Sequence, residues 1–472
     1  MFDSENTLKE IEFLDRKEVE VLEWNSMNLS LPPTVYPPRE DTQLLYDVLE
    51  TFEPFGTSKL LEIGSGSGAL SIAAAKRGWF VDACDINPYA VAATKYNAET
   101  ANVSLNVTEG GIGPSTESLA SIAIEPGGYD MVIWNMPYIP VEEVENQLLG
   151  PLEESALIDT HPEGLLKVFA KRMASNSLCK LSGIGLLVCR GTIGWMRSLD
   201  ILRQHGLAAR VIKSTRFDNG EEIFVLASWI PFVECKHHIV GVIDSTNAEM
   251  LRGPYDVGDS LMARIQTNGR GRHGNQWEDH PKSFKCSWLI DAKNLVEISP
   301  LRQLHVAQEM HFALKFQEKH SEQMLVKWPN DLLVRVDEKN KWRKCGGILF
   351  QSQSKGEEQK LVLGIGINTQ KENLSTGQGA LTEIGIVETW TELFTILNAV
   401  VASLFEEKHP ALVVKWIETY DSNSMLSECI YRNKLHRIVG VSSHHLTIQD
   451  EQGHLIDVED DAGLEWINLH PQ

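Results

Sequence analysis

Six short strings in this 472-residue chain combine side chains that bind nucleotides or assist acyl and methyl chemistry. Two lie in the first half, LEIGSGSGA at residues 61–69 and NMPY at residues 135–138. The other four lie in the second half: GRGRHGNQW (269–277), KWPND (327–331), KCGGIL (344–349) and GIGIN (364–368). Each half has its own order and spacing of such strings, so we expect a fusion of two catalysts.

The glycine-rich string of the first half fits the pattern GxGxxG/A and stands between a predicted strand and a predicted helix. It predicts a tight turn that a nucleotide-like ligand can approach closely. Asp85 ends the next predicted strand, where a carboxylate can accept hydrogen bonds from ribose hydroxyls. NAD, FAD and S-adenosylmethionine (SAM) proteins share this layout, and a glycine turn without a ligand is the alternative.

The tetrapeptide NMPY directly follows a predicted strand at 129–134, so Asn135 stands at the carboxyl end of the sheet. Open α/β folds bind their ligands at this edge. An amide or aromatic amine is a weak nucleophile because its lone pair is delocalised. The Asn135 oxygen and a main-chain carbonyl can accept its two N–H groups and aim the nitrogen at a methyl donor. Such positioning can supply about 7–11 kcal/mol of a barrier. The alternative is a simple turn after the strand, since Asn and Pro are turn residues.

The strings VYPPREDTQLL (35–45), LEIGSGSGALS, DINPYA and NMPYIP resemble, in this order, the HemK-type protein-glutamine methyltransferases over residues 30–230. The similarity is greatest to the eukaryotic and archaeal branch. It implies SAM as methyl donor, the GGQ glutamine of a class-1 translation release factor as acceptor, and a small zinc-bearing activator subunit as partner. It implies SAM contacts at Thr42, Glu62, Gly64, Gly66, Asp85, Ile112 and Asn135, and acceptor contacts at Asn135, Met136, Pro137 and Tyr138, with Asn135 catalytic.

Two positions depart from that family. Met136 replaces the first proline of the usual NPPY, and Gly111 stands where an acidic residue usually lies near the adenine. Two alternatives therefore stay open for the first half. One is a degenerate binding module, and the other is N6-adenine methylation of nucleic acid, which the lack of a separate base-reading domain or basic cluster disfavours.

The glycine string of the second half is followed by polar residues and not by a helix, so it does not predict a dinucleotide site. Arg270 and Arg272 alternate with glycines, and their guanidinium groups can bind carboxylate and phosphate groups bidentately. Lys344 adds a positive charge before a tight glycine turn. Asn330 and Asp331 are candidates for a contact with Mg²⁺–ATP.

The ordered set of STN (245–247), QTNGRGRHGNQW, KWPND, KCGGIL and GIGIN resembles the catalytic domain of biotin protein ligases over residues 236–415. The resemblance implies that biotin and MgATP form biotinyl-5′-adenylate and pyrophosphate. A lysine of a biotin carboxyl carrier domain then takes the biotinyl group. Catalytic roles fall to Arg270, Arg272 and Lys344. The implied biotin and adenylate contacts are Ser245, Thr246, Asn247, Gln266, Gly269, Arg270, Gly271, Arg272, Trp277, Lys344, Gly347 and Asn368.

The second half also has a departure and an alternative. Asn275 stands where the ligases usually have arginine. Lipoate ligases share the fold but usually lack the GRGRxG string, so biotin is the preferred substrate. No helix-turn-helix pattern precedes Lys236, so we expect no DNA-binding domain.

The elements that must position these residues follow from apolar periodicity. Strands and helices alternate from Lys59, which predicts a Rossmann-like, doubly wound α/β methyltransferase domain closed by a strand at 221–229. A helix at 41–53, capped by Asp41 or Thr42, precedes it. The later pattern predicts an α+β biotin/lipoate-ligase catalytic domain with a helix at 301–320, and then a small β-barrel. The expected domains are 1–232, 236–420 and 421–472.

The composition of the chain limits the binding partners and the cellular compartment that we expect. The net charge of −22 argues against a general nucleic-acid or membrane-surface binder, since these need excess Lys and Arg. The seven cysteines include no CxxC pair, which indicates reduced thiols. The N-terminal residues lack an apolar signal region, and no stretch reads as a membrane span. We expect a cytoplasmic protein.

Overall fold

Two compact units make up the chain: residues 1–231 with 407–413, and residues 232–406 with 414–472. The computed structural model describes residues 18–112, 128–137, 139–140, 158–159, 161, 163–190, 195–217, 220, 222–297, 299–315, 321–336, 341–356, 358–413 and 422–470.

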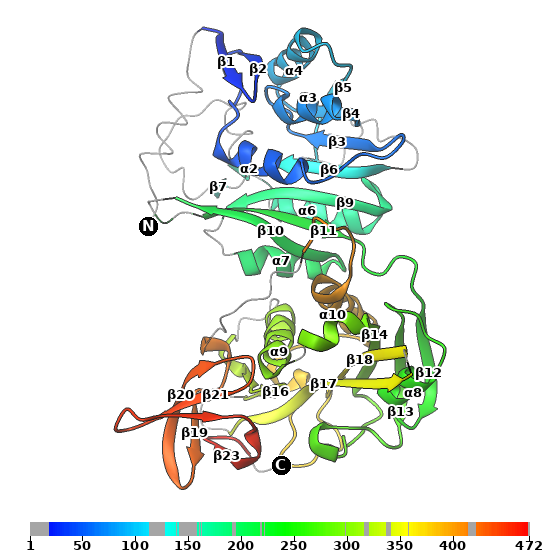
Figure 1. The fold of residues 1–472 in the computed structure, drawn as a ribbon, viewed down its shortest axis with the longest axis vertical. Coiled ribbons are helices and arrows are strands. Elements are labelled where there is room, and N and C mark those ends of the chain that lie inside the picture. Colours follow the sequence, from blue (N-terminus) through cyan, green and yellow to red (C-terminus); the bar gives the residue numbers. More distant parts are fainter. Residues whose placement is uncertain are drawn as a thin grey trace. The chain divides into compact units, whose positions relative to one another are not determined.

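A seven-stranded sheet in the order β10-β11-β9-β6-β3-β4-β5 forms the centre of the first unit (Figure 1). Neighbours from β9 to β5 are parallel, and β11 runs antiparallel between β9 and β10. This is the doubly wound layout that the sequence predicts. The strands are β3 (Lys59–Ile63), β4 (Phe80–Asp85), β5 (Asn106–Glu109), β6 (Tyr129–Asn135), β9 (Cys179–Arg190), β10 (Ala208–Arg216) and β11 (Glu222–Trp229).

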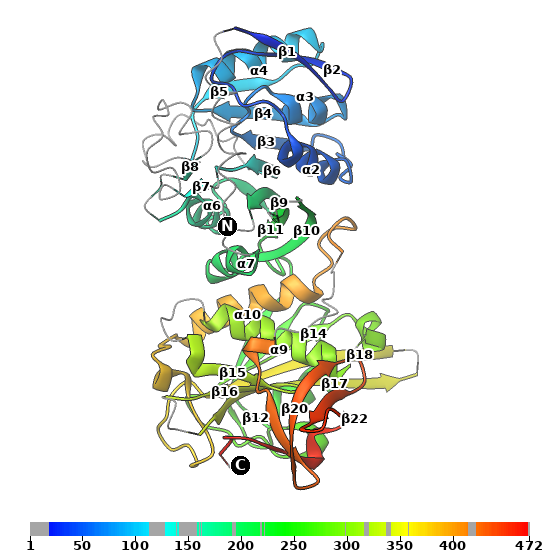
Figure 2. The ribbon, with the colours of Figure 1, turned by 90° about the vertical axis from the view of Figure 1, so that its left-hand side faces the viewer.

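Helices cover both faces of this sheet: α2 (Glu40–Leu49), α3 (Ala69–Lys76) and α4 (Pro88–Thr100) lie on one side, and α6 (Leu165–Ala174) and α7 (Trp195–Gln204) on the other (Figure 2). The predicted start of α4 is confirmed, because the Asn87 side chain accepts the N–H of Tyr89. The predicted cap of α2 is wrong. Its N-cap is Arg39, so Asp41 and Thr42 lie inside the first turn and are buried. The remaining strands are β1 (Glu20–Trp24) paired with β2 (Met27–Leu31), and β7 (Ile139–Pro140) paired with β8 (Ile158–Asp159).

Residues 407–413 belong to the first unit, although second-unit residues flank them on both sides. Leu412 is buried, and Arg210 donates a hydrogen bond to its carbonyl oxygen. The ring of His409 stacks on Phe52 with ring centroids 4.3 Å apart. The segment lies inside the predicted domain 236–420, and the boundary at 420 stays a prediction because the residues on both sides of it belong to the second unit. A short segment of this kind has no periodicity that would predict its packing partner.

A second seven-stranded sheet, in the order β12-β13-β14-β18-β17-β16-β15, forms the centre of the second unit. Helix α8 (Thr246–Arg252) packs on one face and α10 (Trp390–Phe405) on the other. Side chains alternate along β14 accordingly, with Leu289 against Met250 of α8 and Trp288 bonded to Asn398 of α10. The strands are β12 (His237–Ile243), β13 (Ser260–Gln266), β14 (Phe284–Ile290), β15 (Met324–Lys327), β16 (Asp331–Val334), β17 (Arg343–Lys355) and β18 (Glu358–Ile367).

Helix α9 (Pro300–Lys315) packs beside α10. It accounts for the predicted helix at 301–320 up to Lys315, and residues 316–320 lie outside the described residues.

The C-terminal piece is a five-stranded antiparallel sheet in the order β22-β21-β20-β19-β23. Its strands are β19 (Glu428–Tyr431), β20 (Lys434–Val441), β21 (Leu446–Asp450), β22 (Leu455–Val458) and β23 (Leu464–Trp466). Pairing between β22 and β23 is not seen within the described part of the chain, so closure into a barrel stays a prediction.

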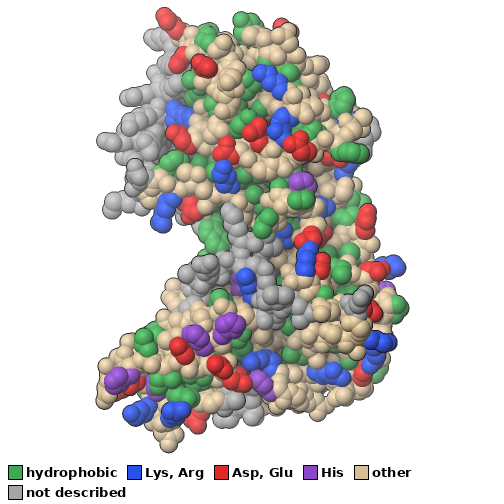
Figure 3. Space-filling view, in the orientation of Figure 1, with side chains coloured by type: hydrophobic (Ala, Val, Ile, Leu, Met, Phe, Trp, Pro, Cys, Tyr) green, Lys and Arg blue, Asp and Glu red, His purple; other side chains and the backbone are tan. Residues whose placement is uncertain are grey.

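The surface agrees with the charge argument. Acidic and basic side chains are interspersed over the face shown in Figure 3, without a continuous basic area on that face. Within the described ranges, the longest apolar helices fall short of what is needed to cross a bilayer.

Candidate active sites

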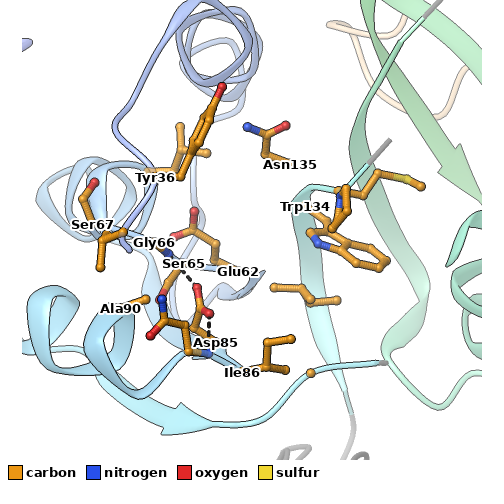
Figure 4. A pocket seen from close by; sticks show the side chains of 18 of the residues that line it. Tyr36, Glu62, Ser65, Gly66, Ser67, Asp85, Ile86, Ala90, Trp134 and Asn135 are labelled. Atoms are coloured by element: carbon orange, nitrogen blue, oxygen red, sulfur yellow. Dashed lines mark hydrogen bonds between the residues drawn. The ribbon is translucent and has the colours of Figure 1, made fainter. Parts of the chain in front are cut away.

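The first pocket opens at the carboxyl ends of β3, β4 and β6 (Figure 4). Every residue predicted to contact SAM lines it: Thr42, Glu62, Gly64, Gly66, Asp85, Ile112 and Asn135. Of the predicted acceptor contacts, Met136 and Pro137 also line it. Tyr138 lies outside the described residues. One concave site thus collects residues from five separate parts of the first unit.

The glycine turn is tied to Asp85. The Asp85 carboxylate accepts the N–H of Gly66 at 2.8 Å through one oxygen and the N–H of Asn87 at 2.9 Å through the other (Figure 4). Gly66 has a positive φ of 53°. A Cβ on Gly68 would lie 2.8 Å from the methyl carbon of Thr94, so the third glycine permits close packing of α4.

Glu62 is buried below this turn, with 4% of its surface exposed. Its carboxylate accepts the N–H of Ser71 at 2.9 Å and also a hydrogen bond from the Ser71 hydroxyl. Burial, with a smaller contribution from the charge of Asp85, raises the pKa of Glu62 to about 8. Burial also raises the pKa of Asp85. A cationic ligand favours the ionised form of both carboxyls, so this pocket suits a ligand with positive charge.

Asn135 lines the pocket, and its side-chain oxygen is an acceptor that no described residue uses. Its Nδ2 donates to Asp41 Oδ2 at 3.0 Å, and Asp41 also accepts the N–H of Thr42 at 2.6 Å. A carboxylate only accepts, so it turns the NH₂ group of Asn135 towards Asp41 and leaves the oxygen facing elsewhere. Asn135 Oδ1 is buried without a hydrogen-bond partner among the described residues. Such an acceptor indicates that a ligand N–H completes the site. Sequence reasoning missed this role of Asp41.

Met136 is a core residue as well as a pocket residue. It is 6% exposed, and its sulfur lies 4.0 Å from the sulfur of Cys189 on β9. The side chain packs into the main apolar cluster of the first unit, beside Trp134. Its replacement of proline therefore changes packing and not only loop rigidity.

The second pocket lies in the second unit and is mainly polar. Ten of the predicted biotin and adenylate contacts line it: Ser245, Thr246, Asn247, Gln266, Arg270, Gly271, Arg272, Trp277, Lys344 and Gly347. Gly269 and Asn368 are not among its lining residues. A Cβ on Gly269 would lie 3.0 Å from the carbonyl oxygen of Trp277, and Asn368 is buried and accepts from the Ser283 hydroxyl at 2.8 Å. Ligand contacts of these two residues stay predictions.

The start of α8 and the end of β13 form one end of this pocket. Gln266 Oε1 accepts the backbone N–H of Thr246 at 2.8 Å and the Thr246 hydroxyl at 3.1 Å. The Ser245 side chain caps α8. The Ser287 hydroxyl on β14 lies 2.7 Å from the Thr246 hydroxyl. Hydroxyl and amide groups are therefore gathered at one end, which suits a ligand with both N–H and C=O groups.

The glycines of GIGIN make room for two pocket residues. A Cβ on Gly364 would lie 2.1 Å from Asn247 Oδ1, and a Cβ on Gly366 would lie 2.9 Å from the indole of Trp277. Asn247 itself donates to Gln351 Oε1 at 3.0 Å and accepts from Ser287 at 2.6 Å. Asn247 therefore joins α8 to β14 and β17.

Five side chains form an alternating row of charges across the other end of the pocket, and we call them the charge row. Asp461 lies 3.1 Å from Arg272 and 2.9 Å from Lys327. Asp331 lies 3.3 Å from Lys327 and 2.7 Å from Lys344. Burial alone would raise the pKa of Asp331, but the charges of Lys344 and Lys327 outweigh it and lower that pKa. Three cations thus converge where an anionic ligand would sit.

Asn330 and Asp331 both line this pocket, and their predicted contact with Mg²⁺ stays a prediction. Asp331 is ion-paired with two lysines, and Asn330 Nδ2 donates to the carbonyl oxygen of Ile348 at 2.6 Å. Within the described part of the chain, one group of His and Asp side chains has ion-binding spacing, namely His273, Asp460 and Asp461. Its Asp461 belongs to the charge row.

The loop 269–277 forms a short hairpin between these two ends. The N–H of Gly271 bonds to the carbonyl of Asn275 at 2.7 Å, and that of Trp277 to the carbonyl of Gly269 at 3.0 Å. The tip, η4 (Arg272–Gly274), carries the arginine that contacts Asp461.

Comparison with known proteins separates the same two halves. A profile described as the biotin/lipoate A/B protein ligase family matches residues 240–368, and one described as ribosomal protein L11 methyltransferase (PrmA) matches residues 39–158. A Methanocaldococcus jannaschii protein named as an N5-glutamine methyltransferase is 36% identical over 126 residues, which are 26% of this chain and 58% of that protein. The chain thus joins a region similar to the biotin/lipoate ligase family to a region similar to protein-glutamine methyltransferases.

Other relatives are similar to one half of the chain or to the other. The bifunctional ligase/repressor BirA of Salmonella typhimurium is 29% identical over 158 residues, covering 31% of this chain and 47% of BirA. The Lactococcus lactis release factor glutamine methyltransferase is 29% identical over 123 residues, covering 26% of this chain and 42% of that enzyme. The chain thus spans about half the length of these curated relatives. A solved biotin protein ligase from Aquifex aeolicus with biotin and ATP gives a TM-score of 0.39 at 22% identity, covering 49% of this chain and 97% of that one.

Proposed function

We propose that this chain is a bifunctional enzyme. The second unit is an ATP-dependent biotin–protein ligase that modifies a biotin carboxyl carrier domain. The first unit is a SAM-dependent protein-glutamine methyltransferase that acts on a translation release factor. The observation that carries the ligase assignment is the polar pocket with its charge row. The observation that carries the methyltransferase assignment is the unpaired oxygen of Asn135.

The ligase mechanism starts from the charge row. The biotin carboxylate attacks the α-phosphorus of ATP, an acyl–phosphate bond forms, and pyrophosphate leaves. Lys344 and Arg272 exchange their carboxylate partners, Asp331 and Asp461, for the reacting carboxylate and phosphate oxygens. Arg270 lines the same pocket and adds a second guanidinium group. The deprotonated amine of the carrier lysine then attacks the acyl carbon, and AMP leaves.

The polar end of the pocket favours biotin over lipoate. The ureido ring of biotin has two N–H donors and one C=O acceptor, which Gln266 and Thr246 can match. The dithiolane ring of lipoate has no such groups and would leave buried polar side chains unpaired, a mismatch that sites of this kind reject strongly. Pyrophosphate exchange supported by lipoate and not by biotin would replace the biotin assignment.

The methyltransferase assignment uses the geometry around Asn135. Its Oδ1 accepts one N–H of the glutamine amide, while Asp41 holds the side chain in this orientation. Burial raises the pKa of Glu62 and of Asp85, and binding of the cationic cofactor favours the ionised form of both carboxyls. Titration of SAM into the protein, followed by mass analysis of the release factor, tests the assignment. Absence of SAM binding favours the degenerate module, and transfer to adenine favours the nucleic-acid enzyme.

Partners and setting complete the proposal. The resemblance adds a small zinc-bearing activator subunit to the proposed partners, and methyl transfer measured with and without that subunit tests this. The seven cysteines are unpaired, which supports a reducing, cytoplasmic setting.

A further inference from the structure

Strands β13 and β14 are paired over only part of their length. The last paired residues are Met262 and Cys286. Beyond them β13 stays paired with β12 as far as Gln266, while β14 is paired with β18 from Phe284. The two strands therefore separate at the end of β13 that brings Gln266 into the ligase pocket.

Lys285 is placed in this separation, and its side chain is 1% exposed. Its ammonium donates to the carbonyl oxygens of Arg264 at 2.7 Å and His280 at 2.9 Å. It also lies 2.8 Å from Asp279 Oδ1. The ammonium thus has two hydrogen-bond acceptors and one carboxylate at ion-pair distance, and a buried charge needs partners of both kinds. Burial lowers the pKa of Lys285, and the charge of Asp279 opposes that effect.

Asp279 extends the contact to Gln266, because its other oxygen, Oδ2, accepts the backbone N–H of Gln266 at 2.9 Å. The carbonyl of Arg264 and the N–H of Gln266 are alternate backbone groups on one edge of β13. Neither residue is paired with β14, because the pairing of β13 with β14 ends at Met262 and Cys286. The Lys285–Asp279 ion pair therefore replaces the missing ladder bonds while the strands stay apart.

We propose that Lys285 and Asp279 are positioning residues for the head group of the acyl substrate. They fix the end of β13, so that Gln266 Oε1 accepts the hydrogen bond from Thr246. The polar ring of the ligand would bind at this same end of the pocket. The inference rests on the proposed ligase function and deepens it. Neither residue lines the pocket, so their effect is indirect and concerns the acyl substrate and not ATP.

The test uses the full chain with Lys285→Met, Asp279→Ala and the double variant. Each single change leaves a buried charge without its partner and lowers the melting temperature. The double variant removes both charges and recovers part of that loss. Its KM for biotin should nevertheless stay about tenfold above wild type, the size expected when one hydrogen bond of ordinary strength is misplaced. Its KM for ATP should change less than about twofold.

Asn398→Ala is the matched control, because it removes the hydrogen bond to Trp288 on the opposite face of the same strand. It should lower the melting temperature and leave the KM for biotin unchanged. Equal rises in the KM for biotin and for ATP, or an unchanged KM for biotin in a folded double variant, would overturn the positioning role. A wild-type chain without biotin-dependent pyrophosphate exchange would instead contradict the ligase function on which the role depends.

Discussion

Asp461 of the C-terminal piece lies 3.1 Å from Arg272 at the tip of the loop 269–277. The turn that carries it, η9 (Asp461–Gly463), thereby holds the loop against the pocket. The same carboxylate lies 2.9 Å from Lys327. In this state a carboxylate of the protein occupies the position at which ligand phosphate would meet the loop arginine.

Asp461→Asn should lower the KM for ATP several-fold, because the phosphate no longer competes with a carboxylate for Arg272. A change of about fivefold corresponds to roughly 1 kcal/mol, the strength of a partly exposed ion pair. Steady-state kinetics at varied ATP measures it. Asp460→Asn is the control, since Asp460 faces His273 at 3.5 Å and lies outside the charge row. A raised KM for ATP would show that Asp461 helps to bind the nucleotide.

Lys344→Ala should slow adenylate formation by about 10²–10³-fold, because it removes a charge aimed at the developing phosphate. Biotin-dependent pyrophosphate exchange measures this step separately from transfer to the carrier. Lys371→Ala is a suitable control, since that exposed lysine pairs with Glu383 away from the pocket lining. Wild-type exchange in Lys344→Ala would remove the catalytic role.

Glu62 gives the first unit a pH dependence. Its pKa is raised to about 8 in the folded protein, well above the ordinary carboxyl value. The folded state therefore holds one proton more than the unfolded state between about pH 5 and pH 8. The free energy of unfolding should fall as pH rises through this window. Glu62→Gln should remove that slope in urea unfolding followed at several pH values, and an unchanged slope would contradict the assignment.

Binding of SAM should depend on the same proton. A cationic ligand favours ionised Glu62, so affinity should rise with pH until about pH 8 and then level off. Calorimetry in buffers of different ionisation enthalpy should show release of a proton near pH 7. Affinity that is constant from pH 6 to pH 8 would mean that Glu62 does not meet the cationic part of the ligand.

Met136→Pro should destabilise the first unit by about 1–3 kcal/mol, because it deletes a buried side chain that packs against Cys189. Met136→Leu preserves the volume and should cost less than about 1.5 kcal/mol. Urea unfolding of both variants gives the comparison. A stable Met136→Pro variant would show that proline at this position suits the loop and that the packing contact is dispensable.

The sequence predicted those parts of the fold that depend on local pattern. Apolar runs located β3, β4 and β6, and Asn87 followed by Pro88 located the start of α4. The glycine strings located both pockets, since close approach of side chains demands glycine at positions such as Gly364. These features are set by residues near one another in the chain.

The parts that the sequence did not reveal depend on distant partners. Asp461 meets Arg272 across 189 positions, and Asp41 meets Asn135 across 94. A single carboxylate carries no spacing signal that would identify its partner. Lys285 appeared as an ordinary strand residue until the separation of β13 from β14 was known. Tertiary packing, and not local preference, assigns these roles.

Intact mass analysis of a carrier domain and a release factor, incubated together with the full chain, biotin, MgATP and SAM, tests most directly whether two catalysts share this chain. The account predicts one biotinyl group on the carrier and one methyl group on the release factor glutamine. It also predicts that Lys344→Ala abolishes only the first and Asn135→Ala only the second. A carrier that stays unmodified, or one variant that abolishes both reactions in a folded chain, would contradict it.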